Sequence, residues 1–462
     1  SKGAESEKMF SDLEIGQSED FKKHLNKYDV IHIDVQWFLI NCEDADNVVP
    51  YITRVVLDEL REVYPEILRQ EVVSLPDALS LVKDKTGRKF IIIIDEWDVL
   101  IRDESANKKV QDEYIRFLRG MFKGTEPTKY IQLAYLTGIL PIKKEKTQSA
   151  LNNFREYSML NAGCLASYIG FTEDEVKALC ETYKKDFTEV KRWYDGYNLM
   201  GVSAYNPRSV VMSMTGGYFN NYWTSTETYE ALRVYIEMNF DGLKDTIIEL
   251  LAGQKAVIDT TTFSNDMVTF ETKDDVLTLL VHLGYLTYDF YTKEVSIPNY
   301  EISEQFASTI KVMGWSEVAN SLKLSDELLK STLNCDAEKV AELIDKAHSD
   351  NTSILKYNDE NSLSCVISLA YYSARKSYIV ERELPAGKGF ADLIFLPRKN
   401  NSNPAMIVEL KYNKSAEGAI EQIKKKQYAD SLKDYSGEIL LVGINYNKDT
   451  KKHDCVIEKI VK

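Results

Sequence analysis

The chain has 462 residues, a net charge of −15, 44% hydrophobic residues and 28% charged residues. This length exceeds what one hydrophobic core usually supports, so we expect two to four domains. The composition is typical of soluble globular domains, and no apolar run approaches the ~18 residues of a membrane span. We therefore expect no membrane partner.

The charge is unevenly distributed along the chain. Residues 356–462 carry a net charge of +4, so the rest of the chain carries −19. This difference suits only the C-terminal region to a polyanion such as a nucleic acid. So small a positive charge is also unremarkable for a region of this length, and by itself it is a weak indication.

The six cysteines are scattered, with no CxxC pair among them. Their spacing argues against a zinc cluster or a disulfide framework. Buried free thiols are the simplest interpretation, and they indicate a reducing, cytoplasmic compartment.

The N-terminal part of the chain alternates strands with helices. Residues 1–28 are expected to form helix and loop, and the β-rich, alternating run at 28–40 predicts a strand. Helices are predicted at 49–72 and at 77–87, and Gly87 closes the second one. This alternation predicts an α/β architecture.

The run KFIIIIDEWD predicts a central parallel strand, buried on both faces, that ends at Asp95 and Glu96. A helix at 109–124 and a strand at 130–140 are predicted to follow. Ligands of open α/β sheets bind at the carboxyl ends of the strands. There Asp95 would hold Mg²⁺ beside nucleotide phosphates, Glu96 would orient a water, and Thr137 would sense the γ-phosphate. A strand end with solvated acids explains the same pattern equally well.

No phosphate-binding loop of the form G-x-x-x-x-G-K-[ST] occurs in the sequence. The nearest approach is KTGRK at 85–89, which lacks the glycine pattern and a following helix. We expect either that the loop lies upstream of Ser1, which the absence of an initiator methionine favours, or that the site is degenerate. ATP is an expected cofactor only if the upstream loop is present.

The middle of the chain is predicted to be mostly helical, with Thr172 as the N-cap of one helix. The order helix, strand, turn, strand at 274–302 resembles a winged-helix unit, although a plain helix–hairpin packing unit explains it as well. Further helices are predicted over 303–355, and 347–353 is a candidate linker.

The C-terminal region is predicted to have the order αβββαββ. The first helix covers 360–375, and the second covers 415–435. The strands are SYIVERELP, GKGFADLIFLP, MIVELKYN, EILLVGINYN and CVIEKIVK.

The strand MIVELKYN places Glu409 and Lys411 two residues apart, so their side chains share one face with Ile407. An acid and a lysine on an apolar face are costly unless they pair or hold a metal. Asp392 lies among apolar residues of the preceding strand. Two carboxylates on adjacent strands would bind Mg²⁺ or Mn²⁺, which activates a water against a phosphodiester. Lys411 would position that water or stabilise the developing negative charge.

Other residues could assist this site. Glu360 on the preceding helix could add an oxygen ligand. Gln422 and the lysines at 424–426 could contact a nucleic-acid backbone. The alternatives are a structural ion-pair cluster for the acids and lysine, and a solvated helix face for the lysine run.

These residues resemble the PD-(D/E)xK nuclease superfamily: Asp392, then Glu409-x-Lys411, with Glu360 on the preceding helix and Gln422 and Tyr428 following. The wider chain resembles bacterial proteins in which an AAA-ATPase-like domain precedes such a nuclease domain. The supporting motifs are IIIIDEWD, LTGILP, WYDGYN, YNPRSV, GFADLIF, IVELKYN and QIKKKQY. Members of that family carry a GKT-type P-loop near the N-terminus, which this sequence lacks.

The resemblance implies an α/β multidomain protein. We expect an AAA-ATPase-like domain at 1–170 with an incomplete P-loop NTPase-like parallel sheet. A helical and winged-helix-like lid would follow at 171–315, and a helical linker at 316–355. A restriction-endonuclease-like αβββαβ domain would occupy 356–462.

Three functions are compatible with these features. The first is a Mg²⁺- or Mn²⁺-dependent nuclease, acting on DNA rather than RNA and coupled to an AAA- or STAND-type ATPase module. The second is a nucleotide-dependent interaction or regulatory protein with a vestigial nuclease domain, and the third is a plain ATPase. The expected partners are nucleic acid at the C-terminal domain, ATP, and further copies of the chain in a homo-oligomer. The expected metal ligands are Asp392 and Glu409, with Asp95 at the nucleotide site.

Overall fold

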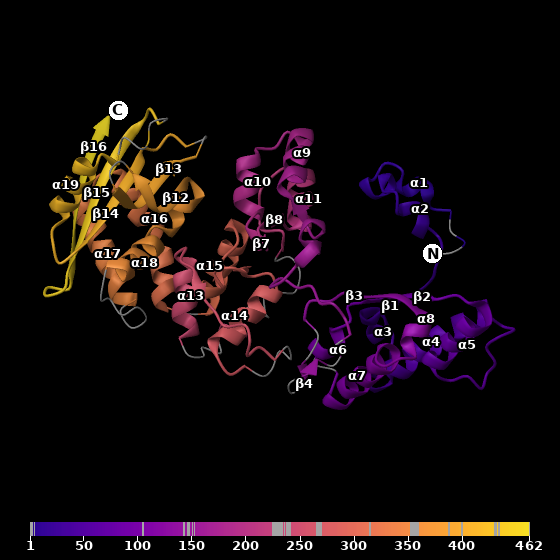
Figure 1. Cartoon of the computed structure of the whole chain (residues 1–462). Coiled ribbons are helices and arrows are strands. Elements are labelled where there is room, and N and C mark those ends of the chain that lie inside the picture. The colour runs from indigo at the N-terminus through magenta and orange to yellow at the C-terminus, as the bar shows by residue number, and fades with distance from the viewer. Residues whose placement is uncertain are drawn as a thin grey trace. The chain divides into compact units, whose positions relative to one another are not determined.

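The computed structural model divides the chain into two compact units (Figure 1). The N-terminal unit comprises Ser1–Ser158 and Thr261–Phe270, and the C-terminal unit comprises Met159–Thr260 and Glu271–Lys462. The structure describes residues 3–461 except 4, 104–105, 142–143, 146–147, 150, 152, 224–233, 235, 237–241, 265–269, 314–315, 352–359, 387–388, 399–400, 429–431 and 433–434. The finer boundaries expected at 170, 315 and 355 remain predictions.

Three parallel strands form the main sheet of the N-terminal unit, in the order β1-β2-β3. They are β1 (Asp29–Asp34), β2 (Phe90–Asp95) and β3 (Ile131–Leu136). The helices that connect them are α3 (Val35–Ile40), α4 (Val48–Val63), α5 (Leu75–Thr86), α6 (Val99–Arg102), α7 (Lys108–Phe122) and α8 (Pro127–Tyr130). This alternation confirms the α/β architecture that the sequence predicts.

The connecting helices lie on one face of this sheet (Figure 1). Right-handed crossovers that proceed steadily from β1 to β2 to β3 place all their helices on the same side. On that side Phe90, Ile92 and Ile94 of β2 are buried in one cluster with these helices.

In the part of the chain that the structure describes, the opposite face of the sheet is exposed to solvent. Leu133 is 55% exposed and Tyr135 is 51% exposed on β3, and Ile91 and Ile93 of β2 are only partly buried. The prediction that the central strand is buried on both faces is therefore wrong for this second face. A continuous apolar run does not by itself reveal whether both sides of a strand are covered.

The first strand is shorter than the predicted run at 28–40. It ends at Asp34, whose side chain accepts a hydrogen bond from the Trp37 amide at 3.0 Å and caps α3. The following helix α4 likewise ends at Val63, before the predicted residue 72. Before β1 the chain forms α1 (Glu7–Phe10), η1 (Glu14–Gln17) and α2 (Phe21–His24), and after β3 it forms the short pair β4 (Lys144–Glu145) and β5 (Gln148–Ser149).

The first half of the C-terminal unit is mostly helical, as predicted. Its elements are η3 (Gly163–Tyr168), β6 (Phe171–Thr172), α9 (Glu173–Tyr183), α10 (Phe187–Tyr194), β7 (Tyr197–Leu199), β8 (Val202–Tyr205), α11 (Pro207–Gly216), α13 (Leu243–Leu251), β9 (Ala256–Val257), α14 (Lys273–His282), β10 (Thr287–Asp289), β11 (Glu294–Ser296) and α15 (Tyr300–Met313). Thr172 forms the capping box of α9 with Glu175. The order α14-β10-β11 matches the predicted helix, strand, turn and strand, and its winged-helix identity remains a prediction.

The C-terminal sheet has five strands in the order β12-β13-β14-β15-β16. Only β14 and β15 pair in parallel, and α19 connects them. The elements are α18 (Glu360–Ala370), η5 (Tyr372–Lys376), β12 (Tyr378–Ala386), β13 (Gly389–Pro397), β14 (Ala405–Tyr412), α19 (Ala416–Lys426), β15 (Glu438–Asn447) and β16 (Lys452–Val461). This mixed sheet has the αβββαββ order that the sequence predicts.

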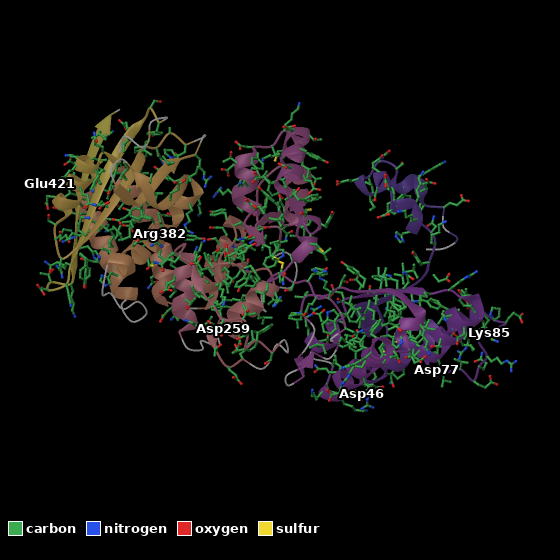
Figure 2. All side chains as sticks on the ribbon, in the orientation of Figure 1. Asp46, Asp77, Lys85, Asp259, Arg382 and Glu421 are labelled. Atoms are coloured by element: carbon green, nitrogen blue, oxygen red, sulfur yellow. The ribbon has the colours of Figure 1, made fainter. Side chains whose placement is uncertain are left out.

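Both faces of the C-terminal sheet are covered by helices, whose side chains are drawn in Figure 2. Helices α16 (Ser316–Leu333), α17 (Ala337–Asn351) and α18 pack on one face, and α19 packs on the other. Helix α17 runs through most of the stretch 347–353 that was a candidate linker, and its apolar side chains belong to the core of the sheet.

A group of charged side chains joins α10 to the C-terminal sheet within the same unit. Glu189 accepts hydrogen bonds from Arg192 at 2.9 Å and from Arg398, directly after β13, at 2.7 Å. Arg192 also donates to the carbonyl oxygen of Arg375 at 2.8 Å. A shared carboxylate with two partners holds these segments together.

Two expectations about the whole chain can be checked against the described residues. All six cysteines are free thiols, but only Cys180 and Cys365 are buried. The prediction of buried thiols is therefore wrong for the other four. Within the part of the chain that the structure describes, no helix is both long enough and apolar enough to cross a bilayer.

Candidate functional site

The acid and the lysine of β14 lie together beneath α19. Glu409 is 2% exposed and Lys411 is 7% exposed, and they share the face that Ile407 presents to α19. The Lys411 ammonium donates to Glu409 Oε1 at 2.8 Å and to the carbonyl oxygen of Leu410 at 3.0 Å. The ion pair offsets the cost of burying both charges, as the period-two pattern predicts.

Asp392 joins this pair from the neighbouring strand. The paired register between β13 and β14 ends at Leu393 and Val408, so Asp392 lies one residue beyond it, on the Glu409 side. Its Oδ2 atom accepts a hydrogen bond from the Leu410 amide at 2.7 Å. The two carboxylates therefore come from adjacent strands at the point where the ladder between them stops.

Helix α19 brings a fourth polar side chain to the site. Gln422 donates from Nε2 to Glu409 Oε1 and, at 3.4 Å, to the Tyr428 hydroxyl, whose pKa is raised by burial. The close approach of α19 depends on Gly443, which pairs with Glu409 on β15. A Cβ atom at Gly443 would lie 2.3 Å from the backbone oxygen of Ala416.

Four of the five residues predicted at this site thus come together: Asp392, Glu409, Lys411 and Gln422. Glu360 begins α18, which packs on the opposite face of the sheet, and its side chain lies outside the described residues. The donor set fits a hard cation, because Mg²⁺ is commonly held by one or two carboxylates together with water and substrate phosphate. Within the described residues, no cluster of three or more metal-ligating His, Cys, Asp or Glu side chains is present.

The predicted nucleotide-site residues lie at one edge of the N-terminal sheet. Asp95 Oδ1 accepts a hydrogen bond from the Thr137 hydroxyl and, at 3.1 Å, from the Glu96 amide. Asp34 pairs with Asp95 in the register of β1 and β2, so a further carboxylate stands at the same edge. The three predicted side chains are therefore neighbours, and Asp34 is an acid that the sequence analysis did not single out.

An arginine links two acids of the DEWD motif. Arg102 donates to Glu96 Oε2 at 2.7 Å and to Asp98 Oδ2 at 2.9 Å. Asp98 is fully buried and also accepts the Leu140 amide at 2.8 Å. Burial raises the pKa of Glu96, and the charge of Arg102 acts in the opposite direction. The sequence analysis missed Arg102 and Asp98; the helical spacing of four residues between them is the signal that could have revealed the pair.

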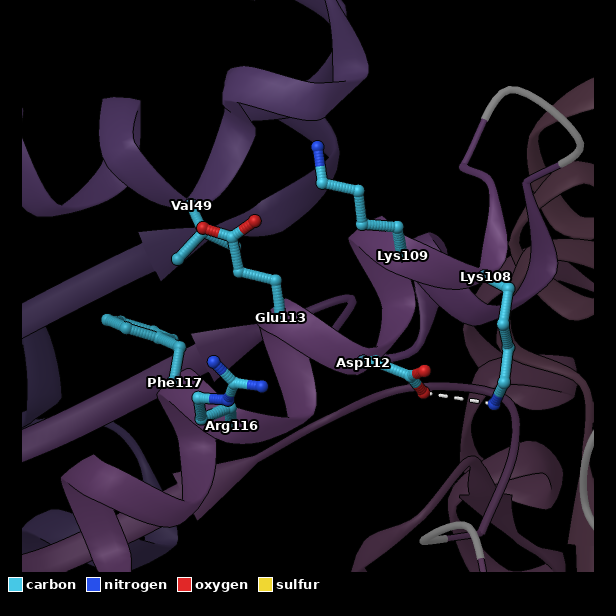
Figure 3. Close-up of a pocket in the computed structure, with 7 residues that line it drawn as sticks. All are labelled: Val49, Lys108, Lys109, Asp112, Glu113, Arg116 and Phe117. Atoms are coloured by element: carbon cyan, nitrogen blue, oxygen red, sulfur yellow. Dashed lines mark ion pairs between the residues drawn. The ribbon is translucent and has the colours of Figure 1, made fainter.

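A groove in the N-terminal unit is lined mainly by side chains of α7 (Figure 3). Its lining residues are Val49, Lys108, Lys109, Asp112, Glu113, Arg116 and Phe117. Lys108 and Asp112 pair with each other at 2.9 Å across one turn of the helix. The groove therefore presents mixed charges and brings no predicted site residue together.

Comparisons with known proteins agree with the two clusters. Residues 2–147 match a family model described as a predicted AAA-ATPase, and residues 358–455 match that of the PD-(D/E)XK nuclease superfamily. The chain therefore combines an AAA-ATPase-like N-terminal domain with a C-terminal PD-(D/E)XK nuclease superfamily domain. It is also similar to an "Uncharacterized protein in vnfD 5'region" from Azotobacter chroococcum mcd 1. The two are 23% identical over 391 residues, which span 79% of this chain and 70% of that protein.

Proposed function

We propose that the protein is a metal-dependent nuclease that hydrolyses phosphodiester bonds of DNA in preference to RNA. The observation that carries this proposal is the cluster of Asp392, Glu409 and Lys411 at the end of the β13–β14 ladder. Burying an acid and a lysine on apolar strands costs free energy of desolvation, and binding of a metal and a phosphate would explain why these charges are present. The superfamily match over the same residues supports the proposal.

In this mechanism Asp392 and Glu409 would hold the metal through their carboxylate oxygens. A bound Mg²⁺ or Mn²⁺ supplies polarisation of the phosphoryl group and lowers the pKa of a water molecule. Lys411 places its ammonium beside Glu409, where it stabilises negative charge that develops on the phosphate oxygens. Gln422 donates to the same carboxylate oxygen and orients it.

We further propose that the N-terminal region is an AAA- or STAND-type module that regulates this nuclease, and that it binds Mg²⁺ and ATP provided that a phosphate-binding loop completes the site. Asp95, Glu96 and Thr137 lie at the carboxyl edge of a parallel sheet, where nucleotide phosphates bind in such folds. The proposed domains are 1–170, the lid at 171–315 and the nuclease at 356–462. The segment 316–355 was expected to be a helical linker, but its helices α16 and α17 pack in the core of the C-terminal sheet.

A second candidate is a nucleotide-dependent interaction protein with a vestigial nuclease domain. The open apolar face around Leu133 and Tyr135 favours it, because exposed apolar patches commonly mark contact surfaces.

The two candidates are separated by cleavage assays on single- and double-stranded DNA and RNA with Mg²⁺, with Mn²⁺ and with EDTA. We expect metal-dependent cleavage of DNA by the wild type and none by Asp392→Asn. Absence of cleavage of every substrate by the folded wild type, under both metals, would favour the interaction protein.

A further inference from the structure

A buried asparagine stands beside the proposed nuclease site on β15. Asn445 pairs with Lys411 in the parallel register of β14 and β15, and it is 1% exposed. A buried side-chain amide is costly unless its donors and acceptor are hydrogen-bonded. The partners of Asn445 therefore indicate what it does.

Both ends of the Asn445 amide are engaged, and they connect different parts of the domain. Its Oδ1 atom accepts a hydrogen bond from the Lys414 amide at 2.9 Å, in the turn that follows β14. Its Nδ2 group donates to Asp454 Oδ2 on β16 at 3.0 Å. Asn445 thus ties the turn between β14 and α19 to the last strand of the sheet.

The same turn is held at three other points, and at one of them Asn413 Oδ1 accepts the Lys448 amide at 2.7 Å. Asn413 adopts a left-handed backbone with a φ of 53°, and its amide donates to the Tyr446 carbonyl oxygen at 2.8 Å. Ser415 then caps α19 by accepting the Gly418 amide at 3.0 Å. The bond from the Lys414 amide to Asn445 lies between the bonds of Asn413 and Ser415. Each residue from 413 to 415 therefore has a hydrogen bond that fixes the path of the chain into α19.

This turn separates the two halves of the proposed site. Lys411 lies directly before it, and Gln422 lies in the second turn of α19 after it. A helix rises 1.5 Å per residue, so Gln422 stands about 9 Å along a rigid element from its start. A small tilt at the turn would move the Gln422 amide away from Glu409 Oε1, where it now donates.

We propose that Asn445 is a positioning residue of the nuclease site. It fixes the turn at 413–415 so that Gln422 and Lys411 reach the same carboxylate oxygen of Glu409. This inference rests on the proposed nuclease function and adds to it a residue that does not touch the reacting atoms.

The test compares Asn445→Ala with Asn447→Ala. Asn447 is on the same strand, and its Oδ1 atom accepts the amides of Asp449 and Thr450 at 3.0 Å each, in the turn to β16. Misplacing a group by about 1 Å costs up to about a hundredfold in rate, so we expect Asn445→Ala to lower kcat at least about tenfold with KM nearly unchanged. Asn447→Ala should leave both constants within about twofold, since its side chain bonds to residues 449 and 450 rather than to residues 413–415.

A double variant provides the rescue. In Asn445→Asp with Asp454→Asn, the carboxylate still accepts the Lys414 amide, and the new amide at 454 donates back to it. We expect the double variant to recover most of the kcat that Asn445→Ala loses. Failure of this rescue, or a kcat for Asn445→Ala within about twofold of Asn447→Ala, would overturn the inference.

A second measurement does not depend on nuclease activity. Amide hydrogen exchange over 413–422 should be faster in Asn445→Ala than in Asn447→Ala, because the Lys414 amide loses its acceptor. Equal exchange in the two variants would contradict the role of Asn445, whether or not the protein cleaves DNA. A wild type that cleaves nothing but shows this difference in exchange would sink the proposed nuclease function and leave the fixed turn in place.

Discussion

The two main sheets of the protein hold acidic residues in contrasting environments. In the C-terminal sheet helices cover both faces, and Glu409 is almost completely buried with Lys411 and Gln422 as its partners. In the N-terminal sheet one face is open, and Asp95 and Glu96 stand partly exposed at the end of a strand.

The difference has a physical origin in the topology of each sheet. A charge within a doubly covered sheet loses its hydration and must be paired, so its presence requires an explanation. A partly exposed charge at the end of a strand, such as Asp95, keeps part of its hydration and depends less on a partner, whereas the fully buried Asp98 nearby is paired with Arg102. Buried acids are therefore the stronger indication of function, and the following predictions test that comparison from the largest expected effect to the smallest.

The largest effect is expected at the buried carboxylate of β14. Glu409→Gln removes a proposed metal ligand and should lower DNA cleavage by about a hundredfold or more, by analogy with the loss of one preorganised charge-stabilising group. Single-turnover cleavage measures it, and Glu421→Gln on the exposed side of α19 is the control. Similar cleavage rates for Glu409→Gln and Glu421→Gln would mean that Glu409 takes no part in catalysis.

The N-terminal sheet should respond in its stability. Arg102→Gln leaves the fully buried Asp98 without its ion-pair partner, which should lower the free energy of unfolding of this unit by about 3 kcal/mol. Urea unfolding measures the change. The control is Lys109→Gln, whose pair with Asp46 at 3.5 Å is exposed and should contribute less than about 1 kcal/mol. An equal loss of stability in Arg102→Gln and Lys109→Gln would show that the ion pairs of Arg102 with Glu96 and Asp98 do not stabilise this unit.

The fit of α19 against the C-terminal sheet can be tested at a glycine. Gly443→Ala places a Cβ atom 2.3 Å from the Ala416 backbone oxygen, so we expect a destabilisation of about 1–3 kcal/mol and a displaced Gln422. Gly120→Ala on α7 is the control, because no atom lies within 4 Å of its Cβ position and alanine favours a helix. Thermal unfolding should shift downward for the first variant only.

The fourth prediction concerns pH. Burial, with the charge of His453 nearby, lowers the pKa of His348 to about 4 from its ordinary 6.5, and Asp345 opposes this shift. The folded state therefore disfavours the protonated imidazole. The free energy of unfolding is therefore unaffected by His348 above pH 6.5. It decreases as the pH falls from 6.5 toward 4, because only the unfolded state takes up the proton in that range. His348→Gln should flatten this part of the stability profile of the C-terminal unit, and an unchanged profile would contradict the assignment.

The sequence alone predicted features that depend on local periodicity. The spacing of Glu409 and Lys411 placed both on one face of a strand, and the alternation of elements predicted the αβββαββ order. The role of Asn445 was not predictable, because it follows from the parallel register of β14 and β15, which join across a helix. The residues of α3 were predicted to be part of a strand, because their apolar side chains are compatible with either a strand or a helix. The N-cap formed by Asp34 is what starts a helix at this point.

The open face of the N-terminal sheet was missed for a similar reason. The run FIIIID is apolar throughout, which predicts burial on both sides. Which face of the strand is covered depends on where other segments pack, and this cannot be predicted from the residues of β2 alone.

The most direct test of the central claim is metal-dependent DNA cleavage by Lys411→Ala against the wild type. Lys339, a partly exposed lysine that pairs with Glu342 on α17, provides the control for removal of a positive charge as Lys339→Ala. We predict that Lys411→Ala cleaves about a hundredfold more slowly or not at all while remaining folded, and that Lys339→Ala matches the wild type. Equal cleavage by Lys411→Ala and the wild type would contradict the assignment of Asp392, Glu409 and Lys411 as a nuclease site.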